Sequence, residues 1–367
     1  MKVAIVCDWL TNVGGAEKVL LEFHKLFPDA PIYTSKYNKK GIDWFKDATV
    51  KTGWLQIFPT CLRRFLGPLR QSYFNHLDLS RYDVIISVTG AEAKSVKKGN
   101  AIHFCYCHAP TQYYWSMYDD YIKNPGFGIL NPFVRFMFKL FVKPLRKADY
   151  KAAQKPDYFI TISNYEKKLI KKYYNRDSIV VHPGVEVEDF KSFAQGAVEN
   201  SKDSFATTSR QVNWKRLDLA ISACIKTGEK LTVIGEGPEH NSLMKLAKDS
   251  KNIKFLPLMN KKSLARELKS AKGYIFPSLE PFGIAPVEAL ATGCPVIALK
   301  DGGALDYIKE GENGVFFEKQ TVESLESAIK KFNETKFKRS SIAKSVDDFS
   351  NARFDKEITE FINEKTL

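Results

Sequence analysis

Residues 278–298 read SLEPFGIAPVEALATGCPVIA and are flanked by two short apolar runs, GYIFPS (273–278) and CPVIALK (294–300). The apolar runs are typical of buried strands, and the stretch between them predicts a loop followed by a helix. We expect Pro286 in the first position of this helix, where its missing N–H costs nothing, and Glu288 in the first turn. Strand, loop, helix and strand in this order form the repeating unit of a parallel α/β sheet.

The same alternation extends over the whole chain. Apolar runs without polar alternation, as expected for strands covered on both faces, recur between amphipathic helices such as those at 14–27, 214–226 and 263–271. The expected strands are VAIVCDW, DVIISVTG, AIHFCYC, DYFITIS and SIVVHPG in the first half, and SFATTSR, KLTVIGEG, IKFLP, GYIFPS and CPVIALK in the second. The pattern predicts doubly wound α/β folds.

A chain of 367 residues exceeds what one compact core usually holds, so two domains are expected. The strand–helix pattern restarts after His182-Pro183-Gly184, and the segment 191–204 is polar. We therefore predict an N-terminal α/β domain over residues 1–185, a C-terminal one over 186–345, and a helix within 346–367. Open α/β sheets bind their ligands at the carboxyl ends of the strands, so a shared cleft is the expected site.

Positive charge is concentrated in the first half of the chain. Residues 1–182 carry 28 basic and 15 acidic side chains (28 − 15 = +13), and residues 183–367 carry 28 and 27 (28 − 27 = +1), which together give the net charge of +14. The first half should face an anionic partner such as a membrane, a nucleic acid or an acidic substrate. A nucleic acid is disfavoured because no stacking platform or groove-reading helix is apparent.

Several other classes of protein are excluded. No apolar stretch approaches the roughly 18 residues of a spanning helix, and the start MKVAIVCDWL reaches an aspartate too early for a signal peptide. The C-x-C spacing of two cysteines lacks the paired arrangement of a zinc site. We expect reduced, buried thiols in a cytoplasmic protein. The cysteines are Cys7, Cys61, Cys105, Cys107, Cys224 and Cys294.

Segments 54–74 and 127–147 combine aromatic and aliphatic residues with lysine and arginine. In the second segment, apolar residues at helical spacing alternate with cations. A basic amphipathic helix of this kind can lie in a membrane interface, although a core-facing helix with a solvated basic face has the same periodicity. With the charge of the half-chain beside it, we favour contact with an anionic membrane. The apolar residues are Phe133, Phe136, Met137, Leu140 and Phe141, and the cations are Arg135, Lys139 and Lys143.

Several polar residues follow predicted strands. Glu280 and Glu288 flank a loop whose amides adjoin a helix N-terminus, so they could hold sugar and ribose hydroxyls beside phosphate oxygens, although a helix cap and a loop acid are the plainer alternative. Arg210 and Lys215 follow SFATTSR and could neutralise a diphosphate, or could simply be solvated. His108 follows AIHFCYC at the same kind of edge, where a lone histidine is more often structural.

The pair Gly14-Gly15 follows the first strand and opens a helix. Glycine lets a ligand approach the backbone, and a helix N-terminus offers free N–H groups to phosphate. The pair is not G-x-G-x-x-G, and no acidic residue follows at the spacing expected for a ribose contact, so a dinucleotide site is not supported.

Together these residues resemble the retaining glycosyltransferases of family 4. Glu280 and Glu288 match that family's E-x7-E motif, including the F-G-I between them. Arg210 and Lys215 match its basic pair, and 233–238 (VIGEGP) matches its glycine turn before a helix. The resemblance implies the GT-B fold, in which two Rossmann-like, doubly wound domains face a central cleft.

Two further motifs narrow the resemblance. The opening C-D-W-L-x-x-x-G-G-A-E-K and the C-H-A-P-x-x-Y-x-W around His108 are similar to the bacterial mannosyltransferase branch that builds surface polysaccharides such as lipopolysaccharide O-antigen. Ala109 and Gln112 depart from this branch, which tends to carry threonine and arginine there. The departures leave the sugar less determined than the type of reaction.

The resemblance implies that a nucleotide sugar binds mainly to the second domain, with Glu288 on the ribose and Glu280 on the donor sugar. Arg210 and Lys215, together with backbone amides, would stabilise the departing diphosphate, so neither a metal nor a cofactor is expected; no D-x-D motif is present. His108 would contact the donor sugar near the reacting carbon. The implied catalytic set is His108, Arg210, Lys215 and Glu280, and the implied donor-binding set is Gly14, Gly15, Gly235, Glu236, Gly237, Phe282, Gly283, Ile284, Ala285 and Glu288.

We therefore expect a hexosyltransferase on the inner face of the cell membrane that moves mannose from GDP-mannose to a lipid-linked glycan, with the C-terminal helix crossing back to the first domain. A UDP-sugar donor and a GT-B-fold sugar-nucleotide epimerase are the alternatives. A catalytically silent sugar-binding protein is disfavoured because the polar site residues are all present. The acceptor, the linkage and the oligomeric state are not determined by the sequence.

Overall fold

The computed structural model describes residues 1–60, 66–123, 125–126, 128–195 and 203–366. The chain divides into two compact units. The first unit comprises Met1–His182 and Asp355–Leu367, and the second comprises Pro183–Phe354. Each unit contains one sheet, and every pairing between its strands is parallel.

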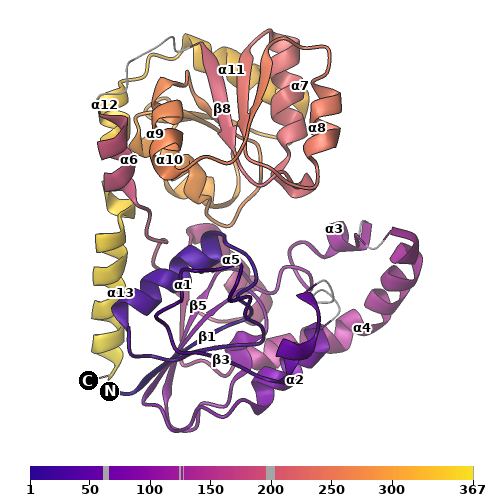
Figure 1. The fold of residues 1–367 in the computed structure, drawn as a ribbon, viewed down its shortest axis with the longest axis vertical. Helices are drawn as coiled ribbons and strands as arrows, with labels where there is room; N and C mark the ends of the chain where they lie inside the picture. Colours follow the sequence, from indigo (N-terminus) through magenta and orange to yellow (C-terminus); the bar gives the residue numbers. More distant parts are fainter. Residues whose placement is uncertain (61–65, 124, 127, 196–202, 367) are drawn as a thin grey trace. The chain divides into compact units, whose positions relative to one another are not determined.

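The sheet of the first unit has the order β3-β2-β1-β4-β5-β6-β7 (Figure 1). Its strands are β1 (Val3–Cys7), β2 (Ile32–Thr34), β3 (Val50–Thr52), β4 (Val84–Thr89), β5 (Ile102–Cys107), β6 (Tyr158–Thr161) and β7 (Ile179–Val180). The helices are α1 (Gly15–Leu26), α2 (Gly67–His76), α3 (Tyr118–Lys123), α4 (Asn131–Ala152), α5 (Asn164–Tyr174) and most of α13 (Asn351–Thr366), with 3-10 turns η1 (Trp54–Ile57), η3 (Ala93–Ser95) and η4 (Gly128–Leu130).

Alternate residues of these strands pack against helices on opposite faces. Tyr106 of β5 contacts Phe23 of α1, and Phe104 contacts Phe361 of α13, so α1 and α13 cover one face. Cys105 and its neighbours point to the other face, where they pack with residues of α5 and the end of α4. Burial on both faces explains why the central strands β1, β4 and β5 are mostly apolar.

The sheet of the second unit has the order β10-β9-β8-β11-β12-β13. Its strands are β8 (Ser204–Thr208), β9 (Lys230–Ile234), β10 (Ile253–Leu256), β11 (Tyr274–Phe276), β12 (Val296–Leu299) and β13 (Gly314–Phe317). The helices are α6 (Val187–Ala194), α7 (Leu217–Thr227), α8 (His240–Leu246), α9 (Lys261–Ser270), α10 (Ile284–Ala291), α11 (Val322–Glu334) and α12 (Arg339–Lys344), with η5 (Asn213–Lys215), η6 (Gly302–Asp306) and η7 (Asp347–Phe349).

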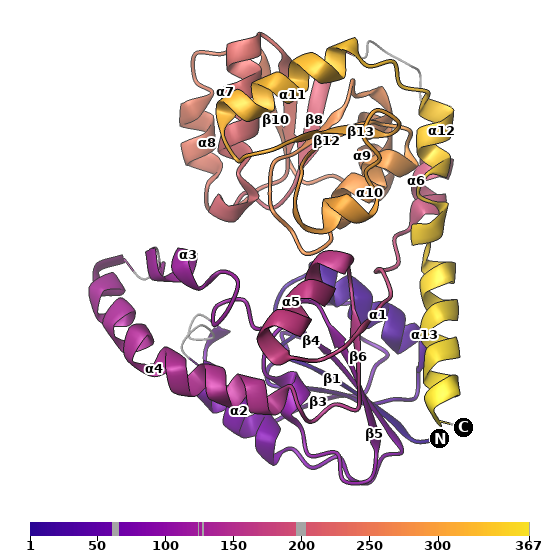
Figure 2. The ribbon, with the colours of Figure 1, turned by 180° about the vertical axis from the view of Figure 1, so that it is seen from behind.

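The largest core of the second unit lies between its sheet and one pair of helices. Residues of α7 and α11 pack there against Phe205, Ile275 and Val315 of the strands, and Figure 2 shows these two helices on the same face. The predicted α/β architecture is therefore confirmed for both units, and all ten expected strands are present.

The start of α10 differs from the prediction. The helix begins at Ile284, two residues before Pro286, and Glu288 lies in the second turn. Gly283 caps the helix with φ +90°, a conformation that glycine adopts without strain. Proline is tolerated at the third helical position because the first four N–H groups of a helix have no intrahelical partner.

Five of the six cysteines are confirmed as buried and free, namely Cys7, Cys105, Cys107, Cys224 and Cys294; Cys61 lies outside the described residues. Among the helices that the structure describes, none combines the length and the hydropathy needed to cross a membrane.

Candidate active site

The predicted polar residues of the second unit follow three neighbouring strands of its sheet. Arg210 and Lys215 follow β8, the glycine turn follows β9, and Glu280 follows β11. Since β9, β8 and β11 are adjacent and parallel, their carboxyl ends meet at one edge. This is the edge at which open α/β sheets bind ligands.

Lys215 and Glu280 are brought into direct contact. Lys215 Nζ lies 2.5 Å from Glu280 Oε1, and both side chains are largely buried, with 16% and 14% of their surface exposed. Ser278 donates a hydrogen bond of 2.7 Å to the same carboxylate oxygen. The ammonium also lies 4.3 Å from the ring centroid of Trp214, a cation–π distance. The two side chains therefore form a fixed ion pair rather than two separately solvated charges.

The glycine turn after β9 brings two stretches of backbone together. Gly235 has φ +116°, and a Cβ there would lie 2.4 Å from the carbonyl oxygen of Ser209. A Cβ at Gly237 would likewise lie 2.4 Å from the carbonyl oxygen of Gln211. Only glycine fits either position, and the turn exposes its backbone to the pocket beside it.

A pocket of about 560 Å³ opens next to this turn. Its polar wall includes His240, whose Nδ1 lies 2.8 Å from Gln211 Oε1, and Gln211 Nε2 donates a hydrogen bond of 2.6 Å to the carbonyl of Gly235. Neither Gln211 nor His240 is predicted from the sequence, because no motif marks them. The lining residues are Gly235, Glu236, Gly237, His240, Met244, Phe255, Leu256 and Pro257.

The loop before α10 is tightly packed. Phe282 is buried, and its carbonyl accepts a hydrogen bond of 2.9 Å from the hydroxyl of Tyr307. Ile284 and Ala285 begin the helix, so their N–H groups have no intrahelical partner. Glu288 is buried, with 7% of its surface exposed, whereas Arg210 and Glu236 are exposed. The structure thus provides backbone donors and a buried carboxylate on one short element.

The remaining predicted residues belong to the first unit. Gly14 caps α1 and Gly15 begins it. His108 follows β5, and its backbone N–H donates a hydrogen bond of 2.9 Å to the carbonyl of Thr89. His108 Nε2 is buried and has no hydrogen-bond partner in the described ranges. Burial lowers the pKa of His108 to about 4, so the imidazole is neutral near pH 7.

Within the described part of the chain, no group of three or more histidine, cysteine, aspartate or glutamate residues could hold a metal ion.

The chain is similar to known proteins in sequence and in fold. Residues 188–348 match the family described as "Glycosyl transferases group 1". The chain is 27% identical over 191 residues to D-inositol 3-phosphate glycosyltransferase from Mycobacterium sp. (strain JLS), which covers 47% of this chain and 44% of that protein. It is 23% identical over 372 residues to alpha-1,3/1,6-mannosyltransferase alg2 from Schizosaccharomyces pombe, which covers 86% and 70% of the two proteins.

Among solved structures, HepE from Anabaena in complex with UDP superimposes with a TM-score of 0.72 at 18% identity, covering 99% of this chain and 100% of that one. The alignment with the mycobacterial relative spans less than half of that protein. Residues 188–348 are therefore similar to the glycosyl transferases group 1 family, and the chain has the GT-B fold.

Proposed function

We propose that this protein is a retaining, metal-independent hexosyltransferase of family 4 that uses a nucleotide sugar. The observation that carries the proposal is the contact between Lys215 and Glu280 at the edge where the glycine turn and the start of α10 also lie. A cation and a carboxylate at such an edge suit a donor that has an anionic diphosphate and a polar sugar. The family match of residues 188–348 supports the same reaction class.

In this proposal Lys215 and Arg210 stabilise the negative charge that develops on the leaving diphosphate, together with the first amides of α10. Preorganised charge of this kind lowers the barrier because it requires no rearrangement during the reaction. Glu280 accepts hydrogen bonds from hydroxyls of the donor sugar, and Glu288 from the ribose. The acceptor oxygen bonds to the anomeric carbon as the bond to the diphosphate breaks, and the diphosphate takes the acceptor's proton.

The proposal assigns two sites on the first unit. His108 is half-buried and its imidazole is neutral, so it can exchange a hydrogen bond with a sugar hydroxyl; its Nε2 atom lacks a partner in the described structure. Gly14 and Gly15 can present the first amides of α1 to an anionic oxygen.

For the donor we propose GDP-mannose, with a UDP-hexose as the competing candidate. The fission-yeast relative is named as a mannosyltransferase, whereas HepE was solved with UDP and with UDP-glucose. The pocket beside Gly235 is large enough for a nucleoside.

A thermal-shift panel tests the proposal with GDP, UDP, ADP, GDP-mannose and UDP-glucose, each with and without EDTA. A ligand that binds only the folded state raises its stability by mass action. A selective rise with GDP and GDP-mannose that EDTA does not change would support the proposed donor. A selective response to UDP would move the donor to a UDP-hexose, and no response to any nucleotide would contradict the site.

We further propose that the acceptor is a lipid-linked glycan and that the protein binds the cytoplasmic face of an anionic membrane through α4. Phe133 and Phe136 of this helix are 64% and 65% exposed, and Leu140 and Phe141 are exposed as well, whereas Met137 is half-buried. Neighbouring apolar side chains in water are costly unless something covers them, and the cations of the same helix suit anionic headgroups.

A further inference from the structure

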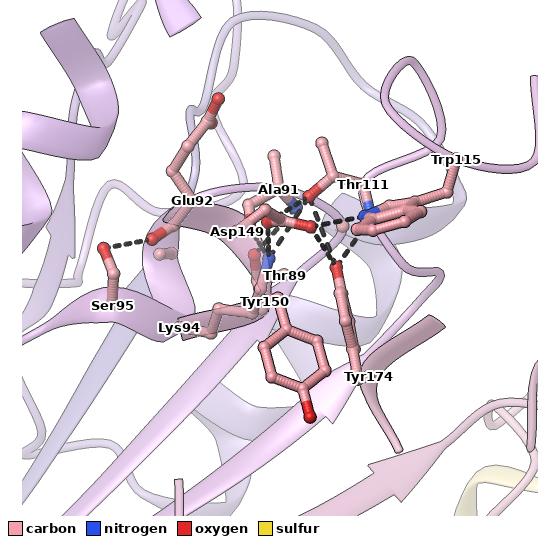
Figure 3. Close-up of polar contacts among 12 residues, drawn as sticks. Thr89, Ala91, Glu92, Lys94, Ser95, Thr111, Trp115, Asp149, Tyr150 and Tyr174 are labelled. Atoms are coloured by element: carbon pink, nitrogen blue, oxygen red, sulfur yellow. Dashed lines mark hydrogen bonds and ion pairs between the residues drawn. The ribbon is translucent and has the colours of Figure 1, made fainter. Parts of the chain in front are cut away.

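A buried ion pair contacts the segment that follows His108. Lys94 of η3 and Asp149 of α4 are 2.7 Å apart between Nζ and Oδ1, and each side chain is 1% exposed. Figure 3 shows the two side chains at the centre of a set of polar contacts that joins η3, α4, α5 and the segment after β5. The two residues are 55 positions apart in the chain.

Asp149 receives four hydrogen bonds, and two of them come from the segment after His108. The hydroxyl of Thr111 donates to Oδ1 over 2.8 Å, and the indole N–H of Trp115 donates to Oδ2 over 2.7 Å. Lys94 is the third donor, and the hydroxyl of Tyr174 is the fourth, at 2.8 Å from Oδ2. That hydroxyl also accepts the backbone N–H of Thr111 over 2.9 Å. Thr111 is thus tied to the carboxylate directly and through Tyr174.

Burying the ion pair of Lys94 and Asp149 costs free energy. This cost argues that the pair fixes the positions of its neighbours rather than stabilises the fold. Removing two charges from water costs several kcal/mol for each ion, and a well-packed apolar pair often does as well. Burial by itself lowers the pKa of Lys94, but the Asp149 carboxylate outweighs it and raises that pKa well above its usual range. The ammonium is therefore charged at neutral pH. An ion pair with its hydrogen bonds satisfied fixes the directions of its partners in a way that apolar packing does not.

We propose that Asp149, held by Lys94, is a positioning residue for His108, an inference that rests on the proposed function. On its amino side, His108 is fixed by the hydrogen bond from its N–H to the carbonyl of Thr89. On its carboxyl side, Asp149 fixes residues 111 and 115, only three and seven positions further along the chain. The segment that carries the imidazole is therefore held by hydrogen bonds on both sides of His108.

A second acidic residue, Glu92, also contacts the segment after His108. The hydroxyl of Tyr113 donates to Glu92 Oε1 over 2.5 Å, and Arg70 pairs with the other oxygen of Glu92 at 3.0 Å. Glu92 adjoins η3, which also carries Lys94. The turn at 92–95 therefore carries one contact to Tyr113 and, through Lys94 and Asp149, the contacts to Thr111 and Trp115.

The test uses Thr111→Val and Trp115→Phe, which remove one donor each and keep most of the side-chain shape. We expect the kcat for sugar transfer to fall by about tenfold to a hundredfold, because a small displacement of a reacting group has this effect. The donor KM should stay within about twofold, since the donor binds mainly to the second unit in the proposed function. Thr111→Ser, which restores the hydroxyl, should recover most of kcat.

Hydrogen–deuterium exchange supplies a readout that does not depend on activity. In Thr111→Val the amides of residues 109–117 should exchange at least about tenfold faster while those of β5 keep their rates. Ser87→Ala is the matched control: it removes a buried 2.8 Å hydrogen bond to His103 in the same sheet, away from the segment. The control should lower the melting temperature similarly without changing kcat or exchange at 109–117.

Two results would overturn the inference: unchanged exchange at 109–117 in both variants, or a loss of kcat in Ser87→Ala as large as that in Thr111→Val. A wild-type protein that transfers no sugar from any nucleotide sugar would contradict the proposed function instead. In that case the exchange experiment still decides whether Asp149 fixes the segment.

Discussion

Lys215 Nζ and Glu280 Oε1 lie 2.5 Å apart although 65 positions separate the two residues in the chain. They meet because β8 and β11 are neighbours in the sheet and each residue follows the carboxyl end of its strand. Within the proposed reaction, the contact aligns the cation that faces the diphosphate with the acid that faces the sugar.

Replacing Lys215 with methionine should therefore remove transfer and leave the fold intact. The loss of one preorganised charge should lower kcat by about a hundredfold to a thousandfold, or about 3–4 kcal/mol of barrier. Glu280→Gln, which keeps the size of the side chain, should also lower kcat strongly. Steady-state kinetics and circular dichroism on the same preparations measure both effects.

The control is Lys272→Met. Lys272 forms a 2.9 Å ion pair with Glu229 in the same unit, and both side chains are similarly buried. This variant should keep its activity. Near-native turnover in folded Lys215→Met and Glu280→Gln would remove both residues from the site.

Gly235→Ala should weaken nucleotide binding. Its Cβ would lie 2.4 Å from the backbone oxygen of Ser209, and the positive φ adds strain of about 1–3 kcal/mol. Gly228→Ala is the matched control, since Gly228 has φ +72° and its Cβ would meet nothing within 4 Å. Both variants should lose stability, but only Gly235→Ala should lose affinity for the nucleotide in isothermal titration calorimetry. Equal affinities in the two variants would contradict the role of the turn.

Reversing the charge of the α4 cations should weaken membrane binding. The triple variant of Arg135, Lys139 and Lys143 to glutamate should sediment less with vesicles that contain an anionic lipid, because each basic residue near such a surface contributes about 1 kcal/mol. The same charge change at Lys245, Lys248 and Lys254, which are exposed in the second unit, should have a much smaller effect. Equal sedimentation of the α4 variant and the wild type would refute the proposed surface.

Glu166 should make the stability of the first unit depend on pH. Its side chain is buried, and burial raises its pKa from 4.5 to about 8. In this window the folded state keeps a proton that the unfolded state releases. The contribution of Glu166 to the free energy of unfolding therefore falls as pH rises from 4.5 to about 8. Glu166→Gln removes this dependence.

The stability of Glu166→Gln relative to the wild type should thus increase steadily with pH through that window and level off above it. Urea unfolding at a series of pH values measures the difference. The exposed Glu312→Gln provides the comparison and should run parallel to the wild type. Parallel curves for Glu166→Gln as well would show that the carboxyl is ionised in the folded protein.

The sequence allowed the sheets to be predicted because long apolar runs and strand-end residues are local signals. Three strands were missed. β2 reads IYT and β3 reads VKT, so neither forms an uninterrupted apolar run, whereas β13 (GVFF) is such a run and was overlooked. The start of α10 was placed too late because proline is common at the first helical position, whereas here Gly283 determines the boundary.

The polar residues of the site were predictable only where a strand end or a motif marks them. Lys94 and Asp149 have no such mark: Lys94 is one of three lysines within 94–98, and Asp149 lies in a helix of mixed charge. Their pairing depends on tertiary packing that brings η3 next to α4. Gln211 and His240 were missed for the same reason.

The most direct test of the central claim follows the anomeric proton of the donor by NMR. Wild-type protein is incubated with GDP-mannose or UDP-glucose and a bacterial lipid extract as the source of acceptor, with Lys215→Met in parallel. We predict that the wild type consumes one donor, releases the nucleoside diphosphate and forms the α-configured product first, while Lys215→Met leaves the donor intact. Both donors remaining intact with the wild type, or a β-configured product appearing first, would contradict retaining glycosyl transfer.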